Sequence, residues 1–387
     1  MSVTGPRGFV AAGIAAGVKA SGDPDLSLVV TADAGAVAAA ATFTSNKLAA
    51  GPVQVSRAHL AATGGRAAAV VLNSGNANAA NGAVGVEHAE RMCSTTAAAL
   101  GCPADDVLVC STGLIGIPFP IEVVEAGVPA LVAARSPEGG ADAARAIMTT
   151  DTVAKEVLVV RPSFSVGGMA KGAAMLAPNM ATMLAVLTTD AAAEPAALQA
   201  ALQAAVDRSF NRLVSDGCTS TNDTVIVLAS GLAGPVDEEE LAAALEEACF
   251  GLASQMVGDA EGATKVVRVE VVGAASDDDA DRGARAIACS QLTKCSWFGE
   301  DPYWGRVASD LGSADIAFDL DRFSIAYGGV VVAAKGIAVD HDAGAVAAHM
   351  QQRHLRVTAD LGLGDGEAFV LSNDLTYGYI DENKGTS

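Results

Sequence analysis

The sequence predicts an α+β protein in which mostly antiparallel β-sheets pack against helices. Short runs of apolar and β-branched residues recur through both halves of the chain, and segments of helical periodicity lie between them. The chain has 387 residues, 51% of them hydrophobic, which is enough for one large core or two linked cores. Composition marks no domain boundary, because beyond an alanine bias there is no low-complexity linker and no internal repeat.

Nine segments have the length and composition of β-strands. They are LSLVV (26–30), AAVVLN (68–73), VLVCS (107–111), VLVV (157–160), MLAVLTT (183–189), TVIVLAS (224–230), KVVRVEVVG (265–273), GVVVAAKG (329–336) and AFVLS (368–372). Their spread along the chain predicts sheets built from both halves of the sequence.

Two segments between these strands are predicted as helices. In residues 195–210 the apolar face is Leu198, Leu202 and Val206, and Pro195 fits the first turn. The second helix begins after Asp237, a capping residue with Glu240 three positions later.

This second helix carries Leu241, Leu245 and Leu252 and ends near Gly258, because glycine commonly terminates helices. Glu261 is therefore predicted to lie in a loop just past a helix end.

The charge of the chain argues against nucleic-acid and membrane-surface partners. Its 24 Lys and Arg residues against 45 Asp and Glu residues give a net charge of −21, which repels phosphate backbones and anionic lipids. The glycines and Lys19 interrupt any N-terminal signal core, and no strongly apolar run reaches the roughly 20 residues that span a bilayer. We therefore expect a soluble, cytoplasmic protein.

The cysteines and histidines indicate neither disulfides nor a metal site. The seven cysteines contain no CxxC pair, and the five histidines lack the spacing of metal ligands. A nucleotide site of the Rossmann or P-loop type is not expected either, because the glycine-rich run after Asn73 lacks GxGxxG and no glycine run is followed by GKS or GKT. We expect no metal and no cofactor.

In the stretch KGAAMLAPNMATMLAVLTTDA (171–191), the residue directly before the predicted strand 183–189 is Thr182, which carries a hydroxyl group. If the Ala181–Thr182 peptide is strained and shielded from water, the hydroxyl can attack the Ala181 carbonyl and convert the amide into an ester. Hydrolysis would leave Thr182 as a new N-terminus, whose amine, with an ordinary pKa of about 7.7 to 8.0, can take the hydroxyl proton near neutral pH. From these residues alone, a threonine that merely begins a strand is an equally good interpretation.

Small polar residues gather around glycine in four other stretches, NSGNANAANG, CSTGLIG, MTTDT and VSDGCTSTNDT. Taken singly, each is typical of a turn or strand end, where such side chains bond to the local backbone. Together with the Thr182 stretch they form an ordered set of motifs: VLVCSTGLIG, IMTTDT, KGAAMLAPNMATML, FNRLVSDGCTSTNDT, EGATK and DPYWGRV. In this order they closely resemble the ornithine acetyltransferase family of arginine biosynthesis, over nearly the whole chain.

The resemblance implies an N-terminal-nucleophile fold formed by self-cleavage between Ala181 and Thr182. Residues 1–181 would be the α chain, with oxyanion-hole and substrate-binding elements. Residues 182–387 would be the β chain, with the nucleophile, further substrate-binding elements and the C-terminal pocket segment. The two chains would stay together, usually as an α2β2 assembly, and Thr182 would carry acetyl from N2-acetylornithine to glutamate by a ping-pong mechanism.

The resemblance also assigns site residues. An oxyanion hole falls on Thr112 and Gly113, a hydroxyl and a backbone N–H suited to stabilising a tetrahedral oxyanion. The implied substrate contacts are Thr149, Lys171, Thr182, Glu261, Asn383 and Ser387, with Thr386 as the alternative to Ser387. Lys171 could meet a substrate carboxylate and Glu261 the ornithine side-chain amine, although each residue alone is equally ordinary at a turn or in a loop.

Three departures from the family pattern bear on the substrate. Cys218 stands where an acidic residue is common, Tyr303 stands where the family usually has DPNWGR, and the chain ends with IDENKGTS, so that the partner of Asn383 is not fixed. Cys218 and Tyr303 are interpreted as packing or indirect changes. Direct use of acetyl-CoA stays open, as do three alternatives: a paralogue with another amino-acid substrate, a self-processing aminopeptidase, and a ligand-binding protein without catalysis.

Overall fold

A computed structural model describes residues 2–176 and 183–385, and these divide into two compact units. Unit 1 contains residues up to 211 together with 218–256, and unit 2 contains 212–217 together with the residues from 257 onward. The predicted Ala181–Thr182 cleavage site, both residues of which lie outside the described ranges, falls inside unit 1. The cleavage prediction therefore concerns a cut within one structural unit.

Unit 1 contains two sheets. In sheet A the strand order is β1 (Phe9–Ile14), β2 (Leu26–Thr31), β5 (Ala69–Asn76), β6 (Val107–Leu114). In sheet B the order is β4 (Arg66–Ala67), β3 (Val37–Phe43), β11 (Thr224–Pro235), β9 (Leu184–Ala192), β8 (Ser165–Lys171), β7 (Lys155–Val160). Sheet B thus combines strands from both sides of residue 182.

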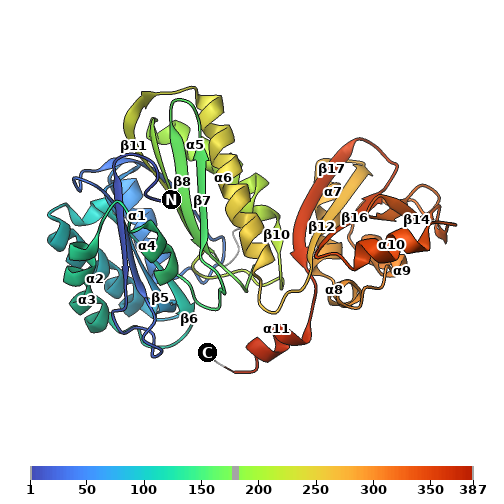
Figure 1. Ribbon diagram of the computed structural model, residues 1–387, viewed down its shortest axis with the longest axis horizontal. Helices are drawn as coiled ribbons and strands as arrows, with labels where there is room; N and C mark the ends of the chain where they lie inside the picture. Colours follow the sequence, from blue (N-terminus) through green and yellow to red (C-terminus); the bar gives the residue numbers. More distant parts are fainter. Residues whose placement is uncertain (1, 177–182, 386–387) are drawn as a thin grey trace. The chain divides into compact units, whose positions relative to one another are not determined.

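The two sheets of unit 1 face each other and are covered by helices (Figure 1). Between the sheets lies an apolar cluster that includes Leu72, Cys110, Val186 and Ile226. On the other face of sheet A pack α1 (Gly51–Ala62), α2 (Gly82–Leu100) and α3 (Ile121–Ala134), and on sheet B lie α5 (Pro195–Arg208) and α6 (Glu238–Gly258). The short α4 (Gly140–Ala146) contributes to the cluster between the sheets. Helix, sheet, sheet and helix form four layers.

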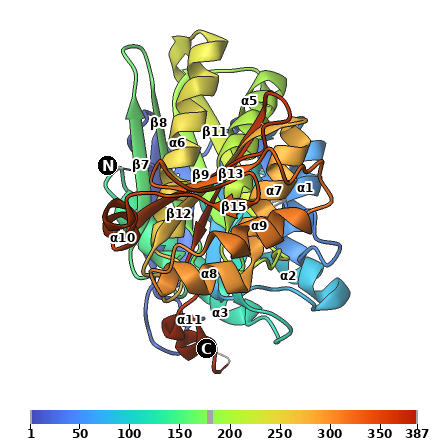
Figure 2. The ribbon, with the colours of Figure 1, turned by 90° about the vertical axis from the view of Figure 1, so that its right-hand side faces the viewer.

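Unit 2 is built on sheet C. The strand order is β10 (Leu213–Val214), β17 (Gly366–Asn373), β12 (Val266–Ala274), β16 (His354–Asp360), β13 (Ser324–Tyr327), β14 (Val330–Ala334), β15 (Ile337–Ala338). Its helices are α7 (Asp277–Cys289), α8 (Gln291–Phe298), α9 (Trp304–Gly312), α10 (Ala343–Met350) and α11 (Tyr377–Glu382). Figure 2 looks onto this unit, with α8 and α9 next to each other.

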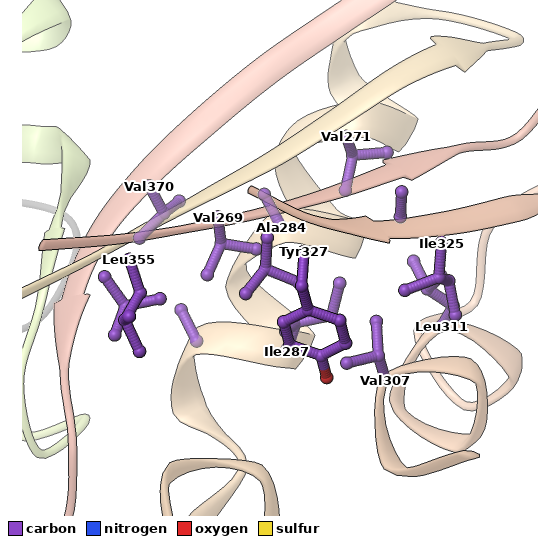
Figure 3. Packing of buried hydrophobic residues seen from close by; sticks show 14 of the residues in the cluster. Val269, Val271, Ala284, Ile287, Val307, Leu311, Ile325, Tyr327, Leu355 and Val370 are labelled. Atoms are coloured by element: carbon purple, nitrogen blue, oxygen red, sulfur yellow. The ribbon is translucent and has the colours of Figure 1, made fainter. Parts of the chain in front are cut away.

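The core of unit 2 is apolar. Val269 and Val271 on β12 alternate with residues of the opposite face, and they pack with Ile287 of α7 and Leu311 of α9 (Figure 3). This alternation is the pattern of a strand with one buried face.

The α+β prediction is confirmed, because most strand pairs in the described residues are antiparallel. Four pairs are parallel: β5 with β6, β9 with β11, β12 with β16, and β10 with β17. A helix lies in the connection of the first two pairs, as parallel neighbours require a crossover.

The two predicted helices are also confirmed. Leu198, Leu202 and Val206 are buried on α5, which begins at Pro195. The Asp237 carboxylate accepts a hydrogen bond of 2.9 Å from the Glu240 backbone N–H at the start of α6, and Glu261 follows the helix in a turn.

Candidate active site

Of the predicted site residues of unit 1, Lys171 lies at one end of sheet B. Strand β8 ends at Lys171, which pairs with Leu184 at the start of β9, and Leu184 in turn pairs with Thr224 at the start of β11. Met183 lies immediately before β9 and is buried. Thr182 and Ala181 lie outside the described residues, so Met183 is the nearest described position on the C-terminal side of the predicted cut.

The segment before β11 connects this strand end to β6. The Asp223 side chain accepts a hydrogen bond of 2.9 Å from the Met183 N–H through Oδ1. Its neighbour Asn222 donates from Nδ2 to the Ser111 carbonyl (2.9 Å) and to the Ala77 carbonyl (2.6 Å). Two adjacent side chains thus link Met183 to the residue that precedes Thr112.

Thr112 and Gly113 lie at the end of β6. Thr112 is 4% exposed, and because Cys110 two residues earlier belongs to the cluster between the sheets, Thr112 lies on the face turned toward sheet B. Gly113 has a φ of +130°, and a Cβ placed there would lie 2.3 Å from the carbonyl carbon of Gly75. Only glycine fits this position. Because glycine has no side chain, the backbone N–H of Gly113 is not covered by one.

A buried carboxylate joins Thr149 to Lys171. Asp151 accepts hydrogen bonds from the Thr149 N–H (3.1 Å), the Gly172 N–H (2.7 Å) and the Lys155 ammonium (2.6 Å), and the Lys171 ammonium lies 3.8 Å away. Burial alone would raise the pKa of Asp151, but Lys171 and Lys155 lower it to about 2. The carboxylate therefore stays ionised beside two buried lysines.

A third lysine lies near this group. The Lys19 ammonium donates to the Met148 and Pro24 carbonyls, each at 2.8 Å, and its stem passes over Gly75, where a Cβ would be 3.0 Å from Lys19 Cγ. Burial lowers the pKa of Lys19, as does Lys171, while Asp25, Asp23 and Asp151 oppose the shift. Lys19 therefore bonds to the residue before Thr149 and lies against Gly75, the residue that Gly113 approaches.

The predicted residues of unit 2 form a pair. Asn383 donates from Nδ2 to a Glu261 carboxylate oxygen at 2.7 Å and to the Tyr379 carbonyl at 2.9 Å. Glu261 is 9% exposed, whereas Asn383 is exposed at the end of α11. Thr386 and Ser387 lie outside the described residues. The structure thus brings Glu261 and Asn383 together within their own unit.

The two atypical residues occupy exposed positions. Cys218 is exposed in the segment before Ser220. Tyr303 is 54% exposed, and its ring centroid lies 5.8 Å from Cζ of Arg306. Neither side chain contributes to a buried core.

The sequence reasoning missed five residues of this region: Lys19, Asp151, Lys155, Asn222 and Asp223. Asp151 and Asp223 lie inside the motifs MTTDT and TSTNDT, so their position was visible but their burial was not. Lys19 and Lys155 lie outside every motif and gave no signal.

Two observations concern other kinds of site. Within residues 2–176 and 183–385, no group of three His, Cys, Asp or Glu side chains could hold a metal ion. In the same ranges, every helix is too short or too polar to cross a membrane.

Comparison with known proteins identifies the family. A profile described as the ArgJ family matches residues 10–385. The chain is 48% identical over 388 residues to the arginine biosynthesis bifunctional protein ArgJ of Thermobifida fusca. It has the same identity, over the same length, to the ArgJ protein of Streptomyces coelicolor. Each comparison covers 100% of both proteins.

Solved structures show similarity to parts of the chain. The ornithine acetyltransferase of Mycobacterium tuberculosis, complexed with ornithine, is 46% identical over 46% of this chain and 94% of that one, with a TM-score of 0.44. The ArgJ protein of Bacillus halodurans is 35% identical over 51% of this chain and 96% of that one, with a TM-score of 0.49. The match of the family profile to nearly every residue, together with the full-length relatives, shows that this chain belongs to the ArgJ family, the ornithine acetyltransferases of arginine biosynthesis.

Proposed function

We propose that the chain cleaves itself between Ala181 and Thr182 and that Thr182 then carries acetyl from N2-acetylornithine to glutamate. The observation that supports this most directly is the pair of hydrogen-bonded links from Met183 through Asp223 and Asn222 to Ser111, which joins the start of β9 to the end of β6. It brings the residue after the proposed nucleophile to the strand that carries Thr112 and Gly113.

The transfer proceeds in two halves. The Thr182 hydroxyl attacks the acetyl carbonyl of N2-acetylornithine while its proton passes to the Thr182 amine. The Thr112 hydroxyl and the Gly113 N–H stabilise the oxyanion. The C–N bond then breaks, and the proton leaves with the ornithine amine. In the second half the glutamate amine attacks the ester carbonyl, the bond from the acetyl carbon to Thr182 Oγ1 breaks, and a proton of the glutamate amine passes by way of the Thr182 amine to Oγ1.

Charge complementarity supports an amino-acid substrate. Lys171 lies in a buried place beside Asp151, where its ammonium would meet a substrate carboxylate. In unit 2 the Glu261 carboxylate, held by Asn383, would bind the ornithine side-chain ammonium. Thr149 and Ser387 would be further substrate contacts.

A second activity is favoured by the names of the relatives, which are called bifunctional. We infer that glutamate is also acetylated from acetyl-CoA on the same threonine. The thioester would acetylate Thr182, and free thiol would be released in proportion to acetylglutamate.

The assembly and location belong to the same proposal. Residues 1–181 and 182–387 would stay together after cleavage, because sheet B contains strands from both. Two such pairs would form an α2β2 enzyme in the cytoplasm.

The test compares wild type with Thr182→Ala. We expect wild type to appear as two fragments in denaturing gels and to transfer acetyl only when a second amino acid is present. Thr182→Ala should remain one folded, inactive chain, and Thr182→Ser should retain some cleavage because it keeps the hydroxyl. Release of acetate or amino acids with water as sole acceptor would instead support a hydrolase, and an uncut, inactive wild type would support a binding protein.

A further inference from the structure

Helix α11 contacts the turn that carries Glu261 from both of its ends. At the end of the helix, Asn383 donates from Nδ2 to Glu261 Oε2 at 2.7 Å. Before its start, the Thr376 hydroxyl donates at 2.6 Å to the carbonyl of Gly262, the residue after Glu261. All four residues belong to unit 2. The same short segment therefore holds both the side chain of Glu261 and the backbone that follows it.

The contact at the start of α11 brings backbone against backbone. Gly262 has a φ of +63°, and a Cβ placed there would lie 2.3 Å from the Tyr379 nitrogen. A Cβ on Gly378 would lie 3.0 Å from the Gly262 Cα. Gly262 leaves no room for a side chain and Gly378 leaves little, so the turn and the helix approach each other as closely as two glycines allow.

The Thr376 hydroxyl has two partners in this contact. Besides donating to the Gly262 carbonyl, it accepts the Tyr379 N–H at 3.2 Å and so caps α11. Thr376 is 5% exposed, which shields both bonds from water. A hydroxyl can donate and accept at the same time, as threonine and serine do and valine does not. Both bonds therefore depend on a hydroxyl at this position.

Asp374 holds the same turn two residues earlier in the chain. Its carboxylate accepts the Thr264 N–H at 2.9 Å, the Lys265 N–H at 3.0 Å and the Thr264 hydroxyl. Asp374 is buried. The backbone after Glu261 is thus fixed at two points, at residue 262 by Thr376 and at residues 264 and 265 by Asp374.

These contacts use one of the two carboxylate oxygens of Glu261. Oε2 accepts the Asn383 amide, whereas Oε1 has no hydrogen-bond partner within residues 2–176 and 183–385. The attraction between a carboxylate and an ammonium group depends on their separation, and little water surrounds a side chain that is 9% exposed. The position of Oε1 therefore determines how well Glu261 can bind an ammonium group.

We propose that Thr376 is a positioning residue that holds Gly262 against α11 and thereby places the Glu261 carboxylate for a primary ammonium group of the substrate. The inference rests on the function proposed above, in which Glu261 binds the ornithine side chain. If Thr376 acts through Glu261, its loss weakens binding of substrates that have this ammonium and spares those that lack it. A residue that only stabilises the fold would affect both kinds of substrate alike.

The experiment measures kcat and KM for N2-acetylornithine and for N2-acetylnorleucine, which has a methyl group in place of the side-chain ammonium. Thr376→Val keeps the size of the side chain and removes the hydroxyl. We expect its kcat/KM for acetylornithine to fall by roughly tenfold to a hundredfold, mainly through KM, and that for acetylnorleucine to change by less than about threefold. Thr376→Ser, which keeps the hydroxyl, should behave like wild type.

A double-mutant cycle tests whether the effect passes through Glu261. Glu261→Gln alone should lower the preference for acetylornithine over acetylnorleucine. Adding Thr376→Val to Glu261→Gln should lower kcat/KM further by less than about threefold, because the carboxylate that Thr376 positions is already absent. A further loss as large as that caused by Thr376→Val alone would overturn the inference.

Ser276→Ala is the matched control, because it removes a hydroxyl that caps α7 in the same unit by accepting the Asp279 N–H at 3.2 Å. It should leave the preference between the two substrates unchanged. An unchanged preference in Thr376→Val would overturn the inference, and if that variant fails to fold, an unchanged preference in Gly378→Ala, whose methyl group would press on Gly262, does so. Absence of acetyl transfer in wild type, or equal use of the two substrates by wild type, would instead refute the function on which the inference rests.

Discussion

One buried lysine site in each unit can be compared, because the two have contrasting surroundings. In unit 1, Lys155 and Lys171 share the Asp151 carboxylate, and all three side chains are at most 4% exposed. In unit 2, Lys294 is equally buried, but it donates to neutral oxygens: the Ser215 carbonyl, Asn373 Oδ1 at 3.1 Å and Ser372 Oγ at 3.5 Å.

The difference is accompanied by different pKa shifts in the two units. Burial lowers the pKa of Lys294 to about 8, although Asp216 and Asp374 favour the charged form. Lys171 lies beside a carboxylate that is ionised down to a pH of about 2. Lys294 of unit 2 therefore titrates close to neutral pH, whereas the buried carboxylate of unit 1 stays ionised.

The largest effect on stability is expected from Asp151→Asn. The substitution leaves Lys155 and Lys171 buried without their carboxylate, and removing one partner of a buried pair typically lowers the free energy of unfolding by about 3–5 kcal/mol. Chemical denaturation would measure the loss. Asp142→Asn is the control, because it breaks an exposed pair with Arg145, for which about 0–1 kcal/mol is expected. Equal losses in the two variants would mean that the buried carboxylate contributes no more to stability than the exposed one.

The Asp151 cluster also shows what sequence reasoning reached and what it did not. The helix capped by Asp237 and the strand that begins at Thr224 were predictable, because capping residues and apolar runs are local signals. Thr149 and Lys171 were named from the family motifs. Their common partner, Asp151, was not, because it is tied to Gly172 across 21 residues of sequence and depends on the packing of sheet B.

Parallel pairing was missed for the same reason. The runs 68–73 and 107–111 were predicted as strands, but nothing local to either shows that they lie side by side and parallel. The division into two units also was not visible, because residues 212–217 join unit 2 through contacts with β17 and α7, distant in sequence.

Thr112→Ala tests whether the reaction belongs to unit 1. Removing one oxyanion donor typically raises the activation free energy by about 3 kcal/mol, so kcat should fall by roughly a hundredfold. Cleavage of the precursor should slow as well, since it passes through a similar oxyanion. Fragment formation on gels and initial rates of acetyl transfer would measure the two effects.

Thr96→Ala is the matched control for that variant. Thr96 is a buried threonine of α2 whose hydroxyl bonds to the Met92 carbonyl, away from the strand ends. It should cleave and turn over normally. If Thr112→Ala behaves like Thr96→Ala, the oxyanion assignment is wrong.

Lys294 predicts a pH dependence for unit 2. A lysine in the unfolded chain has a pKa of about 10.4, whereas the pKa of Lys294 in the folded protein is about 8. Between these two pH values the unfolded state binds more protons than the folded state. The free energy of unfolding therefore rises with pH in this range. Below pH 8 the penalty is complete, at about 3 kcal/mol. The stability of wild type relative to Lys294→Met should therefore increase from pH 7.5 to 10.5, as measured by denaturation at each pH. A difference that is constant with pH would show that Lys294 is not desolvated.

The smallest effects compare one helix cap in each unit. Asp237 accepts the Glu240 N–H at the start of α6, and Asp342 accepts the Ala345 N–H at 2.9 Å at the start of α10. Replacing such a cap by alanine lowers stability by about 1 kcal/mol, whereas asparagine preserves the acceptor.

Because the caps belong to different compact units, their effects should be separable. Asp237→Ala should increase amide hydrogen exchange in α6 and leave α10 unchanged, and Asp342→Ala should do the reverse. Hydrogen exchange resolved by mass spectrometry would distinguish the two patterns, with the Asn variants as controls. Equal acceleration of both helices by either substitution would mean that the units unfold as one body, and the contrast between their lysines would then have to be explained within a single cooperative structure.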